Sequence, residues 1–426
     1  MVYLPSDRAT QPSVAHQPCY RVAPPICATP QSQGLTEIPF NHPLIAGREL
    51  DYIRAALSSD HQAGDGAFTH QCQDWLKRRI GSQAALLTHS CTAALEMAAI
   101  LIDIQPGDEV ILPSYTFVST ANAFVLRGAV PVFVEIRPDT LNLDETKVEA
   151  AITTKTKAIV PVHYAGVSCA MDRLREIADR HQLYLIEDAA QAIAATYQGK
   201  PVGSFGHLAA FSFHETKNVI CGEGGALIIN DPQLEKRAEI IREKGTNRSQ
   251  FFRGEVDKYT WVDVGSSFLP SDILAAMLLA QLEQTDYITQ RRLDIWQLYH
   301  QNLADLEQQG HIRRPIVPAD CQPNGHLYYL LTENLAVRTE LLSYLKSQGV
   351  RSTFHYVPLH NSPAGLKYGR SAGSLAITEA LSDRLVRLPL GGAMTLSEAQ
   401  RVIEVVLDFF ALRALTGRTT DSRLLG

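Results

Sequence analysis

The chain has 426 residues, of which 45% are hydrophobic and 20% charged, and its formal net charge is −6 at pH 7. This composition is that of a globular protein and excludes a fibrous repeat or a chain that is disordered throughout. The length predicts two folded units rather than one, and the absence of a block of Lys and Arg predicts no nucleic-acid partner.

The seven cysteines are scattered without CxxC spacing, which predicts reduced thiols and neither a disulfide framework nor a metal site. No stretch reaches the roughly 18 uncharged apolar residues that a membrane-spanning helix needs. The first residues lack the apolar core and basic start of a secretory signal. We therefore expect a cytoplasmic protein without membrane insertion.

The pattern of the sequence changes three times along the chain and divides it into four parts. Residues 1–36 are rich in Pro, Gln, Ser and Ala, which predicts a disordered extension. In residues 37–275 short apolar runs alternate with amphipathic stretches, as a mostly parallel sheet with crossover helices requires. Residues 276–412 combine a long helical pattern with one strong strand candidate, which predicts a smaller C-terminal α+β domain, and 413–426 are predicted to be a flexible tail.

The first candidate site is the turn between the apolar run 84–88 and the helical pattern that follows it. Ser90 is placed as the N-cap of that helix, and Thr92 falls in its first turn. Free amide groups at a helix N-terminus, joined by such hydroxyls, bind phosphate. An ordinary capped helix has the same pattern, so this segment alone does not decide between the two.

The second candidate lies in P-S-Y-T-F-V-S-T, a loop that leads into a helix and carries Tyr115 and Phe117. Either ring is suited to form one wall for a planar cofactor, although aromatic residues at such a boundary often belong to the core.

The third candidate is L-Y-L-I-E-D-A-A-Q, an apolar strand that ends in Glu187 and Asp188. Ligands of open α/β folds bind at the carboxyl edge of the sheet, so one carboxylate is expected to face a ligand there. A carboxylate in that place is able to hold the protonated nitrogen of a pyridine ring. The alternative is an acidic strand end that caps the next turn.

The fourth candidate is A-A-F-S-F-H-E-T-K-N, a strand followed by a polar turn with a single Lys217. A desolvated lysine loses its proton more readily and then forms Schiff bases, whereas a solvated lysine at a strand end does not. Ser212 is placed to add a hydroxyl to a phosphate, and the C-G-E-G-G that follows lets the backbone approach a ligand closely.

Taken together, S-C-T-A-A-L-E, P-S-Y-T-F-V-S-T, P-V-H-Y-A-G, E-D-A-A-Q and F-S-F-H-E-T-K-N resemble the DegT/StrS family of nucleotide-sugar aminotransferases. The resemblance covers about residues 38–410. It implies the α/β type I aminotransferase fold, pyridoxal 5'-phosphate as the cofactor, and a homodimer with each active site at the subunit interface.

The resemblance also assigns roles to individual residues. Lys217 matches the Schiff-base lysine, and Asp188 matches the partner of the pyridine nitrogen. The implied cofactor shell further comprises a stacking aromatic, a residue near the ring oxygen and three residues of the phosphate cradle: Phe117, Gln191, Cys91, Thr92 and Ser212. The segments that line the substrate side in relatives place there His163, Tyr164, His326 and His355.

Further strings, among them E-K-G-T-N-R-S-Q-F-F-R-G and D-K-Y-T-W, resemble the branch that aminates dTDP-4-dehydro-6-deoxy-D-glucose with L-glutamate for the enterobacterial common antigen. Another keto-sugar, such as a 3-keto sugar, or a cyclitol is the alternative substrate, and a non-catalytic sensor of cofactor or sugar nucleotide is the alternative from another class. A branch that dehydrates its substrate typically has His at the lysine position, which Lys217 disfavours. Leu269 departs from the family, in which many members place there an Asn that reaches the partner's phosphate.

Overall fold

The computed structural model describes residues 37–421, with side chains described as far as residue 415. The predicted extension 1–36 lies outside the described residues, as do residues 422–426. From Glu37 onward the chain forms one compact unit, so the predicted division near residue 275 stays a prediction. None of the helices in the described part of the chain combines the length and the apolar character needed to cross a membrane.

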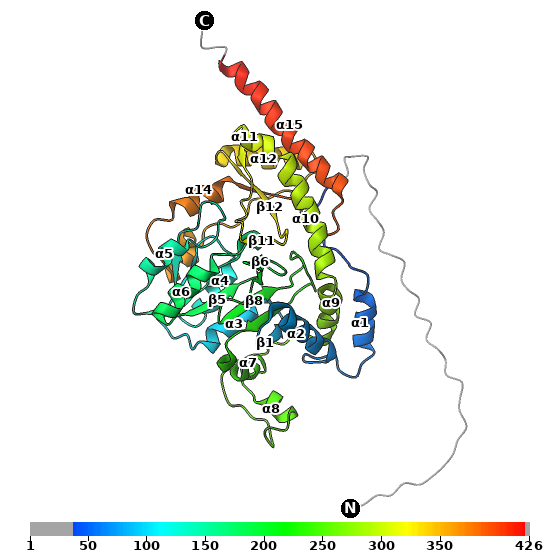
Figure 1. The fold of residues 1–426 in the computed structure, drawn as a ribbon, viewed down its shortest axis with the longest axis vertical. Helices are drawn as coiled ribbons and strands as arrows, with labels where there is room; N and C mark the ends of the chain where they lie inside the picture. Colours follow the sequence, from blue (N-terminus) through cyan, green and yellow to red (C-terminus); the bar gives the residue numbers. More distant parts are fainter. Residues whose placement is uncertain (1–36, 422–426) are drawn as a thin grey trace, which may run out of the picture. The chain divides into compact units, whose positions relative to one another are not determined.

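An eight-stranded sheet forms the centre of the molecule, in the strand order β1-β9-β8-β5-β4-β2-β3-β13 (Figure 1). The pairs from β8 to β13 are parallel, and β9 runs antiparallel to both of its neighbours. This topology confirms the predicted, mostly parallel α/β sheet. The strands are β1 Ala84–Thr88, β2 Glu109–Pro113, β3 Val130–Val134, β4 Thr156–Ile159, β5 Tyr184–Asp188, β8 Leu208–Ser212, β9 Gly225–Ile229 and β13 Arg370–Ser371.

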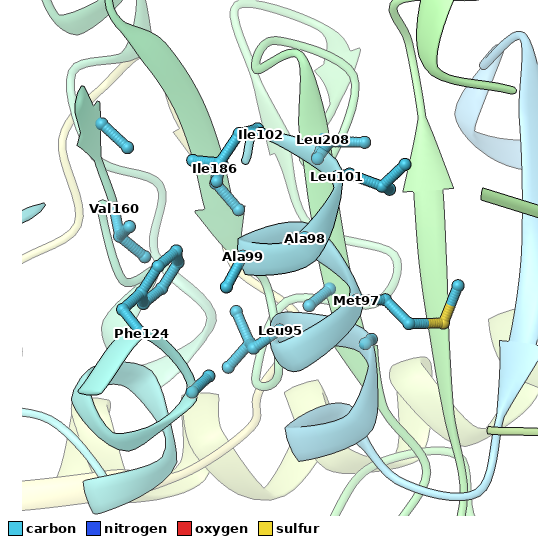
Figure 2. Close-up of a cluster of buried hydrophobic side chains, with 14 of the residues drawn as sticks. Leu95, Met97, Ala98, Ala99, Leu101, Ile102, Phe124, Val160, Ile186 and Leu208 are labelled. Carbon is cyan, nitrogen blue, oxygen red and sulfur yellow. The ribbon is translucent and has the colours of Figure 1, made fainter. Parts of the chain in front are cut away.

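Helices cover both faces of this sheet, so its strands are buried on both sides. Alternate residues of one strand enter different clusters: Leu86 joins the core around α3 and α4, while Leu87 joins the core around α2 and α9. Figure 2 shows α3 lying against the sheet, with Leu95 and Ala99 close to Phe124 of α4 and to Ile186 of β5. The helices of this region are α1 Glu49–Leu57, α2 Ala67–Ile80, α3 Cys91–Leu101, α4 Val118–Val125, α5 Glu145–Ala151, α6 Met171–His181, α7 Glu235–Arg242, α8 Arg248–Phe252 and α9 Asp272–Leu282.

The C-terminal part adds a three-stranded antiparallel sheet, β10-β12-β14, that packs with helices around a separate hydrophobic core. These elements are β10 Ile312–Arg313, β12 Tyr328–Thr332, β14 Leu385–Leu388, α10 Thr285–Asn302, α12 Leu335–Ser347 and α15 Leu396–Asp421. Shorter elements complete the part of the chain that the structure describes: β6 Thr196–Tyr197, β7 Lys200–Pro201, β11 Cys321–Gln322, α11 Ala304–Gln308, α13 Pro363–Tyr368 and α14 Ala376–Arg384.

Three features of this part differ from the sequence-based expectation. The single long helical pattern after Ser271 is broken between α9 and α10. The strand β13, although it comes from the C-terminal part, pairs with β3 of the large sheet. The last helix continues to Asp421, beyond residue 412 where the folded unit was expected to end, while the flexibility predicted for residues 413–426 stays a prediction. Arg413 contacts Glu340 of α12, which shows that α15 still packs on its neighbour at this point.

Candidate functional site

A cavity of about 580 Å³ lies where the strands of the large sheet end and the C-terminal part covers them. Its walls combine residues that follow β1, β2, β5 and β8 with residues around β12 and β14. Nine of the eleven site residues predicted from the sequence line it: Cys91, Thr92, Phe117, Asp188, Gln191, Ser212, Lys217, His326 and His355. His163 and Tyr164 do not.

The beginning of α3 forms one end of the cavity. Ser90 caps the helix as predicted, with its Oγ accepting a hydrogen bond from the Ala93 amide at 3.1 Å. Thr92 Oγ1 lies 2.8 Å from Ser119 Oγ of α4. A Cβ on Gly225 would lie 2.4 Å from the Cys91 amide nitrogen, so only glycine lets β9 pass this close to the helix start. Amides at a helix start, joined by hydroxyls, form a site suited to a phosphate.

Asp188 ends β5 at the base of the cavity and is 5% exposed. Its Oδ2 accepts a hydrogen bond from Thr120 Oγ1 at 2.7 Å, and its Oδ1 accepts one from the Ala190 amide at 3.2 Å. Burial raises the pKa of Asp188, while these two hydrogen bonds and the positive charge of Lys217 favour the carboxylate. The side chain is therefore held in place to receive a cationic group of a ligand.

Glu187 points to the other side of the strand and has a structural role. It is fully buried and accepts hydrogen bonds from the amides of Gly203, Phe205 and Gly206 at 2.7–2.8 Å. Its Oε2 also lies 3.0 Å from His163 Nε2. The expectation that His163 lines the substrate side is therefore corrected: its ring is buried beneath the cavity, because Glu187 binds one of its nitrogens and the Cys169 amide donates to the other at 3.2 Å.

Lys217 follows β8 in the turn that ends F-S-F-H-E-T-K, and it faces the cavity. The side chain is partly exposed because it faces the cavity. The surrounding protein nevertheless desolvates its ammonium group, which lowers the pKa of Lys217. The Cys91 sulfur and Asp188 oppose that shift, and the positive charge of Arg387 adds to it. A lysine in such surroundings is deprotonated more readily than a solvated one, as a nucleophilic amine requires.

Aromatic side chains form one wall of the cavity. Phe117 is 56% exposed at the start of α4, and its ring centroid lies 6.5 Å from that of Tyr356. Tyr115 is buried behind this wall and does not line the cavity, so the geometry favours Phe117 as the stacking residue. Tyr164, expected on the substrate side, is also buried and does not line the cavity; it lies behind the lining residue His355, with its Oη 2.8 Å from His355 Nδ1.

Amide side chains position the remaining polar groups. Gln191 Oε1 accepts from the Ala165 amide at 2.7 Å, and Gln191 Nε2 donates to Tyr356 Oη at 2.8 Å. His326 Nδ1 lies 2.9 Å from Asn218 Oδ1. Burial and nearby positive charges hold the pKa of His326 well below its usual range, so its ring is neutral.

The cavity also has lining residues that the sequence analysis missed, among them Thr120, Arg292, Tyr356 and Arg387. Thr120 was detectable, because it stands in P-S-Y-T-F-V-S-T one helical turn after Thr116, and the two hydroxyls lie 2.7 Å apart. Arg292 and Arg387 gave no signal, since a single arginine in a helix or strand pattern is normally solvated.

Leu269 is not among the cavity-lining residues. Within the described residues no cluster of three or more His, Cys, Asp or Glu is arranged to hold a metal ion.

Comparison with known proteins adds an independent line of evidence. A family model described as the DegT/DnrJ/EryC1/StrS aminotransferase family matches residues 43–407. The spore coat polysaccharide biosynthesis protein SpsC of Bacillus subtilis is 34% identical over 379 residues, which cover 87% of this chain and 96% of SpsC.

Solved structures agree with the sequence match. The aminotransferase TlmJ from Streptoalloteichus hindustanus superposes with a TM-score of 0.81 at 30% identity, covering 89% of this chain and 100% of TlmJ. The PLP-form of Spr1654 from Streptococcus pneumoniae has a TM-score of 0.80 at 28% identity, covering 88% of this chain and 99% of Spr1654. The predicted type I aminotransferase fold is thereby confirmed.

The surroundings of Glu187 predict that Glu187→Gln destabilises the fold. An amide presents one acceptor oxygen and two donors to a pocket filled by donors, so we expect the free energy of unfolding to fall by about 2–5 kcal/mol. Urea denaturation measures the loss, with Glu176→Gln on the exposed face of α6 as the control. A loss equal to that of the control would contradict a structural role for Glu187.

The hydrogen bond from Thr120 predicts that Thr120→Val raises the pKa of Asp188 further. The bond stabilises only the charged carboxylate, so without it the proton is held to a higher pH. Carbon-13 NMR of labelled aspartate side chains follows the titration, and Thr339→Val on α12, whose hydroxyl bonds its own helix, is the matched control. An unchanged Asp188 titration would show that the bond does not favour the carboxylate.

Proposed function

The chain belongs to the DegT/DnrJ/EryC1/StrS aminotransferase family, and from this premise we propose that it transfers the amino group of L-glutamate to dTDP-4-dehydro-6-deoxy-D-glucose with pyridoxal 5'-phosphate as its cofactor. The products are dTDP-4-amino-4,6-dideoxy-D-galactose and 2-oxoglutarate. One observation carries the proposal: a desolvated lysine and a buried carboxylate, Lys217 and Asp188, line the same cavity.

The lining residues fit each part of the cofactor. The start of α3, with Ser90 and Thr92, and Ser212 at the end of β8 suit the phosphate. Asp188 is the acceptor for a protonated ring nitrogen, and it lacks an ion-pair partner within hydrogen-bonding distance among the described residues. Phe117 offers its ring from the start of α4 as a wall for a planar group.

When bound, pyridoxal phosphate supplies an aldehyde that takes up the amino group and a protonated ring that withdraws electrons from the reacting carbon. Lys217 Nζ takes the proton from the α-carbon of glutamate in the first half-reaction, and in the second it delivers a proton to C4 of the sugar. Asp188 keeps the ring nitrogen protonated through its carboxylate. Desolvation lowers the pKa of Lys217, which favours the free amine that accepts a proton.

Two observations support a sugar nucleotide as the amino acceptor. SpsC, one third identical to this chain, is named for the biosynthesis of a polysaccharide. The strings G-D-G-A-F-T and R-S-Q-F-F-R-G resemble the dTDP-4-amino-4,6-dideoxygalactose transaminase of the enterobacterial common antigen more than other members. These strings favour the 4-keto sugar over a 3-keto isomer or a cyclitol.

We further propose that the protein works as a homodimer with its active sites at the interface. The segment around α8 extends away from the sheet (Figure 1) and exposes four aromatic rings: Phe251, Phe252, Tyr259 and Trp261. Phe252 is 69% exposed and Trp261 78%, which is costly for a single chain in water. A second copy of the chain that covers these rings would remove that cost.

The proposed location is the cytoplasm. Five cysteines in the described part of the chain are free thiols, and four of them are buried. Thiols of this kind persist where the surroundings are reducing.

The proposed function is tested by single-turnover spectroscopy on protein loaded with pyridoxal phosphate. Glutamate should remove the visible absorbance of the bound cofactor, and only the 4-keto sugar should restore it. Restoration by the 3-keto isomer alone would replace the substrate but keep the aminotransferase. No response to glutamate would contradict an aminotransferase with this donor.

Lys217→Ala should lower turnover by about 10³-fold or more, because the variant lacks the group that moves the proton. Its circular dichroism and its unfolding midpoint should stay close to those of the wild type. Lys200→Ala, a change at an exposed lysine of β7, is the control and should retain turnover. Near-normal turnover of Lys217→Ala would overturn the assignment of this residue.

The exposed rings predict that Phe252→Glu combined with Trp261→Glu converts the dimer to a monomer. A carboxylate in place of each ring would have to be buried without a partner in the interface. Sedimentation velocity measures the mass, and Leu335→Glu, at an exposed leucine of α12, is the control. A dimer that persists in the double variant would show that α8 does not form the interface.

A further inference from the structure

Residues 37–44, which we call the strap, contribute to the cavity wall although they come from the start of the described chain. Apart from one bridge at Ile38, the strap forms no helix or strand. Two of its residues, Phe40 and Asn41, line the cavity together with Lys217. The reaction described above gives neither of these two residues a role.

The strap is anchored at both ends. At its start, the Ile38 amide donates to the Gly349 carbonyl oxygen at 2.8 Å, and the Ile38 carbonyl oxygen accepts from the Arg351 amide at 3.0 Å. The Ile38 side chain is buried in the core of the C-terminal part. At its end, the Leu44 carbonyl oxygen accepts a hydrogen bond from Gln281 Nε2 of α9 at 2.8 Å, and the side chain of Leu44 packs on the core around α2 and α9. The two ends are thus fixed on different cores, with the cavity-lining residues between them.

The two lining residues of the strap contact different parts of the wall. The guanidinium carbon of Arg387, on β14, lies 4.6 Å from the centroid of the Phe40 ring. Asn41 Nδ2 donates a hydrogen bond to the Glu215 carbonyl oxygen at 3.0 Å. Glu215 stands two residues before Lys217 in the turn after β8. One residue of the strap therefore contacts the small sheet, and the next contacts the turn that carries the lysine.

The 214–217 turn is otherwise held by bonds within its own hairpin. The Glu215 amide donates to the Gly222 carbonyl oxygen at 3.0 Å, and the Lys217 amide donates to a carbonyl oxygen of the turn itself at 2.9 Å. Within the described residues, the bond from Asn41 is the one hydrogen bond that the backbone of this turn receives from outside the hairpin of β8 and β9. Without it, the turn is tethered only through its own hairpin.

We propose that Asn41 is a positioning residue for Lys217 and acts through the Glu215 carbonyl group. This inference rests on the proposed function, because it assigns Asn41 to the reaction of that lysine. Asn41 holds the turn against the strap, so that the amine of Lys217 stays in one place in the cavity. The placement requirement is steep, since a shift of about 1 Å is enough to lower a rate by about 100-fold.

The fold itself does not depend on this bond. Asn41 is partly exposed, and its removal leaves the anchors at Ile38 and Leu44 intact. An exposed hydrogen bond contributes little to the stability of the whole chain, because water replaces the lost partner. The effect of the bond is therefore expected at the turn rather than in global unfolding.

The experiment compares Asn41→Ala with the wild type in the full chain. The matched control is Asn302→Ala, because Asn302 Nδ2 makes the same kind of exposed bond, to the Leu298 carbonyl oxygen of α10 at 2.9 Å. Hydrogen exchange with mass spectrometry measures the opening of the turn in protein without cofactor. In protein loaded with pyridoxal phosphate, stopped-flow absorbance measures the half-reaction with glutamate, and isothermal calorimetry measures the binding of glutarate, a dicarboxylate that cannot react.

In Asn41→Ala the amides of Glu215 and Lys217 should exchange about 2- to 10-fold faster, since one hydrogen bond no longer opposes the opening of the turn. The limiting rate of the half-reaction should fall by about 10-fold, while glutarate binding and the unfolding midpoint stay unchanged. Asn41→Asp keeps the size of the side chain without the donor and should change the exchange and the rate in the same direction. It carries the test if the alanine variant does not fold.

The pKa of Lys217 gives a further readout that a merely structural role would not move. Desolvation lowers this pKa, so a turn released into solvent should let it rise toward its usual value. The pH dependence of labelling by an amine reagent, read at the Lys217 peptide in protein without cofactor, follows the shift. The labelling curve of Asn41→Ala should move to higher pH, and that of Asn302→Ala should not.

Three results would overturn the proposal. Unchanged exchange would show that Asn41 does not restrain the turn, and faster exchange with an unchanged limiting rate would show that the restraint does not serve the reaction. Weaker glutarate binding with an unchanged limiting rate would make Asn41 a substrate contact instead. If the wild type itself does not react with glutamate, the proposed function fails, and this outcome is distinct because exchange of the turn is measured without any reaction.

Discussion

Two opposite charges, the carboxylate of Asp188 and the ammonium of Lys217, are enclosed in one cavity at the carboxyl edge of the sheet. Water cannot stabilise either charge as it would at the surface, so the protein must do so. This requirement explains the hydrogen bonds from Thr120 and the Ala190 amide to Asp188. Burial raises the pKa of Asp188 and lowers that of Lys217, because both shifts favour the neutral form of the group.

Strand β5 carries two neighbouring carboxylates, one with a structural role and one that faces the cavity. Successive side chains of a strand point to opposite faces, so Glu187 and Asp188 have different surroundings although they are neighbours. Glu187 accepts hydrogen bonds from three backbone amides of the 203–206 turn, and its carboxylate also contacts the His163 ring. Asp188 faces the cavity. The hydrogen bonds of Glu187 thus hold β5 from one side, while those from Thr120 and Ala190 hold Asp188 on the other.

The sequence predicted local elements better than it predicted which side chains meet. The cap of α3 by Ser90 follows from cap chemistry, and the end of β5 at Asp188 follows from its apolar run; both signals are local. His163 was placed on the wrong side because its motif gives its position along the chain but not the rotation of its ring toward Glu187. Arg387 was missed since its environment depends on Phe40, which is far away in the sequence. The pairing of β13 with β3 was missed because β3 is also far away in the sequence and because the two residues of β13 carry no periodic signal.

The residues that line the cavity come from two parts of the chain, the large sheet and the C-terminal part. The residues suited to the cofactor come from strand ends and helix starts of the large sheet, between Ser90 and Lys217, where the backbone geometry is tightly fixed. His326, His355 and Arg387 come from the C-terminal part, on or beside the small sheet of β12 and β14. The two groups of lining residues therefore belong to different packing units, one around the large sheet and one around the small sheet. Substrate choice is able to vary in such a scaffold while the proposed proton-transferring group, Lys217, stays in place.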